Sequence, residues 1–221
     1  MQHILVAVRF GVASRWALRW ANDLRQALPL DLRLVHAVPA LANASQVQGM
    51  RETLREWAAA EVGVHVPAES ILVGAGTPLD VILQAAALPD VALLVVGGPL
   101  ATDEQGRSEL LHSLLHRCTV PLLVVGPHGQ RPVIVAATEG VELPPAIVGL
   151  ADWMTSVAGG EVATLGKASV ASQILATARQ RQADLVIVAT PRERAEDSPV
   201  ADDVLDEARR TVLFVPSKPE T

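Results

Sequence analysis

Glycines and a hydroxyl side chain that could hold a phosphate group follow one apolar segment of the chain. Gly97 and Gly98 end a segment rich in Val and Leu, and Gly106 and Ser108 stand a few residues beyond it. Glycines let backbone N–H groups approach a phosphate closely, and a helix N-terminus adds a favourable dipole. Arg9, at the end of another apolar segment, could hold the same anion or pair with a nearby acid. Residues of these types could bind an anion if the fold brought them together.

Two other constellations could carry chemistry, and both are incomplete. His112 and His116 are spaced i, i+4, which lets two imidazoles bind a metal from one helix face, but no third ligand stands near them. The run Gly106-Arg-Ser-Glu-Leu110 has part of a hydrolase nucleophile elbow, yet it lacks the closing glycine and follows a loop. We interpret Ser108 as the N-cap of a helix over 108–117. We therefore expect no metal site and no enzyme activity.

Composition and charge restrict the partners and the compartment. The net charge of -6 disfavours nucleic acid as a partner, since neutralising phosphates needs a basic face. The longest uncharged apolar run is too short to span a bilayer, and no basic leader precedes an apolar core. We expect a soluble cytoplasmic protein with no membrane partner.

Cys118 is the only cysteine, which rules out an intrachain disulfide. It stands just before an apolar segment, where a small buried side chain is the usual role of a free cysteine. Redox sensing is the alternative use of this thiol.

Apolar segments alternate with helical periods over residues 1–127. Five segments rich in Val, Ile and Leu are short enough for buried strands: 3–8, 31–38, 70–74, 91–97 and 121–126. The helices expected between them are 13–27, 44–61, 78–88 and 108–117. Thr77 followed by Pro78 predicts an N-cap and a first-turn proline. The alternation predicts an α/β fold with a doubly wound parallel sheet.

The chain also repeats itself, with a deletion in the second copy. Residues 3–8 realign with 132–137 at an offset of 129, whereas residues 82–96 realign with 174–188 at an offset of 92. Subtracting 92 from 129 leaves 37 residues missing from the second copy, about one strand, one helix and their loops. Internal repeats of this kind determine the whole architecture.

The missing unit is the second strand and the second helix. The second copy predicts strands 133–137, 161–165, 184–189 and 211–215 and helices 143–157, 169–181 and 200–209. Its strand 161–165 precedes the helix that matches 78–88, so it corresponds to the third strand of the first copy. We predict two tandem domains, a five-stranded 1–127 and a four-stranded 131–221, joined by a linker at 127–132. A domain of about ninety residues is small, so we expect it to pack against the first.

Five segments of the first repeat follow, in order, the pattern of a known family. They are Ile4–Val8, Ala13–Ala21, Leu34–Pro39, Val91–Gly97 and Val120–Val125. Together they resemble the universal stress protein family. The resemblance implies Rossmann-like sheets of the adenine nucleotide alpha-hydrolase type, with strand order 3-2-1-4-5. It also implies dimers, or tandem chains whose two repeats form a pseudo-dimer through their last strands. Residues 121–126 and 211–215 should then lie antiparallel and adjacent.

The resemblance implies a nucleotide site that this chain keeps only in part. Members that bind ATP or AMP end their first strand in Asp-Gly-Ser, where this chain has Arg9-Phe10-Gly11. Their phosphate loop has the form G-x2-G-x9-G-[S/T], but Leu100 and Ala101 stand where the second glycine would be, and Asp103 and Glu104 add negative charge. The residues of this candidate ATP or AMP cleft are Arg9, Val38, Gly97, Gly98, Gly106 and Ser108, with Val38 matching the valine whose backbone holds the base.

The second repeat lacks the strand that would carry the base, and its own loop 189–199 contains no glycine. We expect it to bind no nucleotide. Two hypotheses for the whole chain remain open. The first is a non-catalytic stress-response or regulatory protein that acts by dimerising or by binding an unknown protein partner, with no cofactor. The second is a stress sensor that binds ATP or AMP in the cleft of the first repeat.

Overall fold

The computed structural model describes residues 2–98, 106–126, 133–138, 148–149, 151–152, 155, 161–165, 171–183, 185–191, 199–207 and 211–217. The loop 99–105, the linker 127–132, most of the expected helix 143–157 and the end of the chain from residue 218 lie outside the described residues. The chain divides into two compact units, Met1–Val120 and Pro121–Thr221. The fifth strand of the first repeat is therefore grouped with the second unit.

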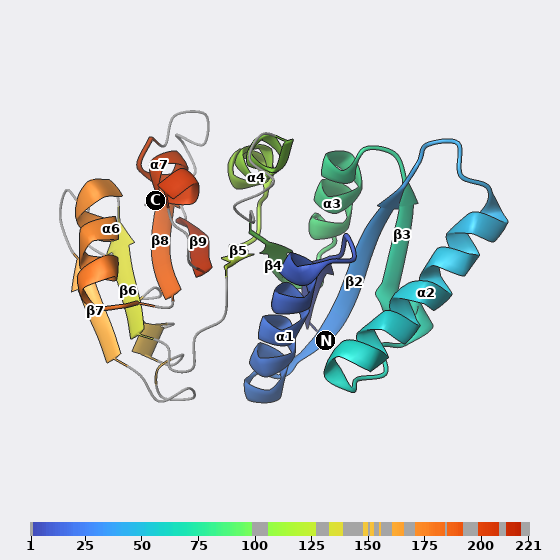
Figure 1. The fold of residues 1–221 in the computed structure, drawn as a ribbon, viewed down its shortest axis with the longest axis horizontal. Coiled ribbons are helices and arrows are strands. Elements are labelled where there is room, and N and C mark those ends of the chain that lie inside the picture. Colours follow the sequence, from blue (N-terminus) through green and yellow to red (C-terminus); the bar gives the residue numbers. More distant parts are fainter. Residues whose placement is uncertain are drawn as a thin grey trace. The chain divides into compact units, whose positions relative to one another are not determined.

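The first unit is a parallel sheet covered by helices (Figure 1). Its strands are β1 (Gln2–Ala7), β2 (Leu30–Val38), β3 (Ile71–Ala75) and β4 (Val91–Gly97). Its helices are α1 (Val12–Ala27), α2 (Ala44–Val62), α3 (Pro78–Ala86) and α4 (Gly106–Arg117), with a short 3₁₀ turn, η1 (Ala68–Ser70). The strands lie in the order β3-β2-β1-β4. The predicted α/β class with a doubly wound sheet is confirmed.

Local chemistry explains where two of these helices begin. Thr77 caps α3 as predicted, because its Oγ1 accepts a hydrogen bond from the Asp80 backbone N–H at 3.2 Å and Pro78 follows it. The start of α2 is a capping box. The Asn43 side chain accepts from the Gln46 N–H, and the Gln46 side chain accepts from the Asn43 N–H, both at 2.9 Å.

The strand order places a crevice at one end of the first sheet. From β1 the chain moves outward to β2 and β3, and it then returns across β1 to form β4. Right-handed crossovers therefore place α1 and α2 together on one face and α3, with α4 beside it, on the other (Figure 1). Between β1 and β4 the helices leave in opposite directions, and open α/β sheets bind ligands at such a point.

The second unit is a mixed sheet in the order β5-β9-β8-β6-β7. Its strands are β5 (Leu122–Val125), β6 (Val133–Thr138), β7 (Glu161–Leu165), β8 (Leu185–Pro191) and β9 (Thr211–Ser217), and its described helices include α6 (Ala171–Gln180) and α7 (Pro199–Glu207). The predicted antiparallel pairing of the two last strands is confirmed, since Leu122 stands opposite Phe214 and Val124 opposite Val212. These paired side chains are buried.

The pairing of β6 in the second unit differs from that of β1 in the first. In the first unit, β2 lies between β1 and β3. In the second unit, β6 pairs directly and in parallel with β7, from Val133 opposite Glu161 to Ala137 opposite Leu165. The predicted deletion of the second strand–helix unit would lead to this pairing. Every helix in the described part of the chain is too short or too polar to cross a membrane.

Candidate functional site

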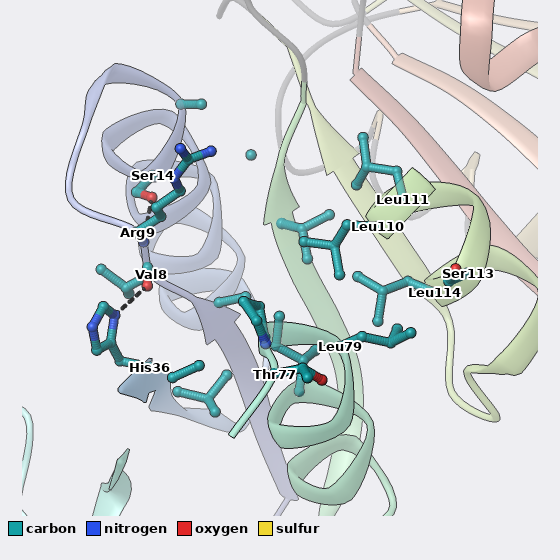
Figure 2. A pocket seen from close by; sticks show the side chains of 18 of the residues that line it. Val8, Arg9, Ser14, His36, Thr77, Leu79, Leu110, Leu111, Ser113 and Leu114 are labelled. Carbon is teal, nitrogen blue, oxygen red and sulfur yellow. Dashed lines mark hydrogen bonds between the residues drawn. The ribbon is translucent and has the colours of Figure 1, made fainter. Parts of the chain in front are cut away.

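A cleft of about 610 Å³ opens at the carboxyl ends of the strands in the first unit. Its strand residues are 7–9 at the end of β1, 35–37 in β2 and 96–97 in β4. Its helix residues are 13–14 of α1, 77–79 and 82 at the start of α3, and 109–111 and 113–114 of α4. Figure 2 shows Arg9 and His36 on one side of the cleft and Leu110, Leu111 and Leu114 across from them. The cleft thus lies at the crevice that the strand order creates.

Arg9 lies exposed at this cleft, immediately after β1. Its backbone N–H donates a hydrogen bond to Ser14 Oγ at 2.9 Å, which ties the loop after β1 to the first turn of α1. Among the described residues, no acidic side chain forms an ion pair with the Arg9 guanidinium. Arg9 is therefore a cation at the cleft that is available to an anion.

An aromatic cluster borders the same loop. His36 Nδ1 lies 2.7 Å from the Val8 carbonyl oxygen, and because a carbonyl can only accept, Nδ1 carries the proton and donates it. The ring of Phe10 meets His36 edge-on at 5.3 Å and Trp57 of α2 at 5.7 Å. Phe10 adopts a positive φ of 51°, which is uncommon for a bulky residue. Sequence reasoning did not single out this cluster, and the only signal was a polar histidine in an apolar strand.

Gly97 lines the cleft, but its surroundings indicate a packing role. A Cβ atom added there would stand 2.6 Å from the backbone carbon and oxygen of Ala13 in α1. The glycine therefore allows the first turn of α1 to pack against the end of β4. Gly98 follows it, is buried, and does not belong to the cleft lining.

The other candidate residues are Val38, Gly106 and Ser108, and of these Val38 lies outside the cleft lining. Val38 is buried and pairs with Ala75, and its carbonyl accepts a hydrogen bond from the Gly76 N–H at 3.0 Å. The prediction that Ser108 caps a helix over 108–117 is wrong, because α4 already begins at Gly106. Gly106 and Ser108 are described only as part of the backbone of this helix. Leu100, Ala101, Asp103 and Glu104 lie outside the described residues.

Most polar groups of the cleft are already hydrogen bonded. Ser14 Oγ accepts from the Arg9 N–H, and Thr77 Oγ1 donates to Asp80 Oδ2 at 2.6 Å while it caps α3. The charged side chains of the lining are Arg9 and Glu109, which lies exposed in the first turn of α4. The remaining surface is mainly apolar, so the cleft suits a ligand with an apolar body.

The residues considered for metal or redox chemistry lie on or after α4. His112 and His116 are half-buried on this helix. Within the described residues, no group of three or more His, Cys, Asp or Glu side chains could hold a metal ion. Cys118 is free and half-buried, whereas a small buried side chain was expected there. Burial nevertheless raises the pKa of its thiol, because the thiolate loses solvation.

A charged cluster lies away from the cleft, near the amino ends of β1 and β4. Arg33 holds the Asp90 carboxylate with two hydrogen bonds, Nη1 to Oδ1 at 2.8 Å and Nη2 to Oδ2 at 2.9 Å. These bonds lower the pKa of Asp90. His3 Nδ1 stands 3.3 Å from Asp90 Oδ2, at ion-pair distance but without hydrogen-bond geometry. The cluster ties β1, β2 and the residue before β4 together.

Several solved structures resemble this chain in fold. A universal stress protein from Archaeoglobus fulgidus superposes with a TM-score of 0.69 at 12% identity, over 99% of this chain and 97% of that one. A putative universal stress protein from Pseudomonas aeruginosa superposes with a TM-score of 0.72 at 14% identity, over 98% and 93%. The cytoplasmic domain of a prokaryotic cation chloride cotransporter gives 0.51 at 13% identity, over 99% and 97%.

The structural likenesses, at these identities, concern the fold alone. No curated protein matches the sequence. The model of the universal stress protein family matches residues 1–126, which is more than half of the 221 residues. The cleft, the strand order and this match agree, and the chain belongs to the universal stress protein family.

Proposed function

We propose that this chain is a non-catalytic stress-response protein that acts by binding a protein partner or a second copy of itself, without ATP or AMP as a cofactor. The observation that carries the proposal is Arg9 at the end of β1. Nucleotide-binding members of the family have an aspartate at this position. A cation in its place removes the carboxylate that those members use.

Three further features support a cleft without nucleotide. Gly97 is accounted for by its close approach to Ala13, so its presence needs no phosphate. The carbonyl of Val38 already accepts from Gly76, and Val38 is not among the residues that line the cleft. The Ser14 and Thr77 hydroxyls are likewise engaged within the chain. Among the described residues around the cleft, these engaged groups leave a nucleotide fewer partners for its polar edges, and unpaired buried polar groups are costly.

Isothermal titration of the full chain with ATP and with AMP tests this proposal. We expect no saturable heat up to millimolar nucleotide. Saturable binding that Arg9→Ala abolishes would overturn the proposal.

The second candidate function is ATP or AMP sensing in the same cleft. It is favoured by the position of the cleft at the switch point between β1 and β4 and by the Arg9 guanidinium beside it, which forms no ion pair with a described residue. The titration above decides between the two functions. Arg51→Ala, on the exposed side of α2, is the matched control because it removes the same charge away from the cleft.

Self-association is tested separately from nucleotide. Sedimentation equilibrium over a range of protein concentrations should give a mass above that of one 23.3 kDa chain if a second copy is the partner. A mass that stays at one chain at every concentration would exclude self-association and leave a different protein as the partner.

A further inference from the structure

We propose that the cleft of the first unit binds a small organic monoanion with an apolar body, a carboxylate on a hydrocarbon chain. This inference rests on the proposed function, because it assigns to the same cleft a ligand other than a nucleotide. Three properties of the cleft favour this ligand: its apolar walls, its polar groups that already bond within the chain, and its charge.

The walls of the cleft are suited to a hydrocarbon. Leu79 and Ile82 of α3 contribute to the lining, as do Leu110, Leu111 and Leu114 of α4. Figure 2 shows the three α4 leucines facing the side of the cleft that carries Arg9. An apolar chain placed along them would leave water, which is the main source of affinity in small-ligand clefts.

The engaged polar groups disfavour a ligand with many hydrogen-bonding edges. Ser14 Oγ, Thr77 Oγ1 and His36 Nδ1 all bond to the chain itself. A heterocycle or sugar placed against them would gain fewer hydrogen bonds from these partly engaged groups than it makes with water. A hydrocarbon has no such loss.

The charge of the cleft favours one negative charge and not several. In the part of the lining that the structure describes, Arg9 is the only arginine or lysine and Glu109 is the only carboxylate. Among the described residues, Arg9 forms no ion pair, so its guanidinium can hold one carboxylate in a two-pronged contact. The first turn of α1 and the start of α3 also line the cleft, and helix N-termini favour anions. A polyphosphate would instead bring repeated charge near Glu109.

The experiment uses the full chain and octanoate as the probe. Isothermal titration should show saturable binding of one octanoate per chain. The matched probes are 1-octanol, which keeps the hydrocarbon and lacks the charge, and inorganic phosphate, which has charge and no hydrocarbon. We expect 1-octanol to bind at least about tenfold more weakly, since a charge-assisted pair is lost. Phosphate should give no saturable heat.

Two substitutions locate the site. Arg9→Gln should weaken octanoate binding by about tenfold or more and leave 1-octanol binding unchanged. Arg9 is exposed, so this variant should fold, and its circular dichroism spectrum checks that it does. Leu110→Gln should weaken both probes, because it places a polar group on the apolar wall. Arg51→Gln is the control that should change neither.

The outcomes separate this inference from the proposed function. If octanoate does not bind, if 1-octanol binds equally well, or if Arg9→Gln has no effect, the inference is wrong. Failure of octanoate together with failure of ATP and AMP overturns the cleft assignment and leaves the proposed function standing. Saturable ATP binding that displaces octanoate overturns the proposed function and leaves the cleft assignment standing.

Discussion

Gly97 at the end of β4 lies against the backbone of Ala13 in the first turn of α1, with room for a hydrogen atom but not for a methyl group. A Cβ at Gly97 would stand 2.6 Å from both the carbon and the oxygen of Ala13. Because both partners are backbone, neither can move aside as a flexible side chain would. The contact sets how closely α1 approaches the sheet beside the cleft.

Gly97→Ala should therefore destabilise the chain by about 1–3 kcal/mol, the usual range for added volume in a packed site. Gly49→Ala is the matched control. Gly49 lies in the exposed middle of α2 with nothing within 4 Å of its added Cβ, so alanine there should stabilise by about 0.5–1 kcal/mol. Urea unfolding followed by tryptophan fluorescence measures both changes. Equal effects of the two substitutions would contradict the packing role.

Asp90→Asn should destabilise the chain by on the order of 1–2 kcal/mol at neutral pH, since the largely buried Arg33 would lose a charged partner. Because Arg33 lowers the pKa of Asp90, the stabilisation is fully present above the ordinary value of 3.8 and is lost as pH falls through the lower folded-state value. The difference in unfolding free energy between wild type and variant should accordingly shrink as the pH is lowered below about 4.

Glu56→Gln is the control for this experiment. It removes one negative charge at an exposed position of α2. Its effect at neutral pH should stay within about 0.5 kcal/mol. A loss as large as that of Asp90→Asn would show that net charge, and not the Arg33 pair, is responsible.

Phe10→Gly should leave the chain more stable than Phe10→Ala, by about 1 kcal/mol, although both remove the same ring. Phe10 has a φ of 51°, and glycine adopts such a backbone at no steric cost while alanine does not. Both variants lose the contacts with His36 and Trp57, so that loss cancels in the comparison. Thermal unfolding of the two variants side by side gives the difference. Greater stability of the alanine variant would mean that the loop relaxes to a negative φ.

Cys118 should react slowly with iodoacetamide in the folded chain at about pH 8, because burial raises the pKa of its thiol and the thiolate is the reactive form. The same chain unfolded in urea should react faster, and Cys118→Ser should not react at all. The contribution of Cys118 to folding stability changes with pH in the opposite direction to that of Asp90. The folded state favours the neutral thiol, so the contribution is present below pH 9.0 and is lost as the pH rises through the higher folded-state value. Equal rates in the folded and unfolded chains would contradict this account.

Local chemistry is what made the elements predictable from sequence. The Thr77–Pro78 pair placed the start of α3 because a cap acts over three or four residues. The Val- and Leu-rich segment 91–97 coincides with β4, because a strand buried on both faces is a continuous apolar run and can be recognised from neighbouring residues alone. The predicted start of α4 is wrong because serine is a common N-cap residue, but Ser108 lies inside the helix.

The candidate site was less predictable because its contacts join distant parts of the chain. Nothing in the residues around Gly97 indicates that Ala13 lies against it. The cluster of Phe10, His36 and Trp57 likewise brings together a loop, a strand and a helix. A single sequence shows which residues could bind a phosphate, whereas only the folded arrangement shows which of them serve packing.

The direct pairing of β6 with β7 has a consequence for how such chains change length. All strands from β7 through β6 and β8 to β9 run in the same direction. Excising one strand together with its helix therefore leaves two neighbours of matching polarity, and they can join with the same hydrogen-bond pattern. Excision of one strand from an antiparallel sheet would instead bring together two strands that run in the same direction. Their hydrogen bonds would then have to follow the parallel pattern in place of the antiparallel one. In this architecture a strand and its helix form a removable module, and a unit like β2–α2 could be reinserted between β6 and β7 without reversing any strand.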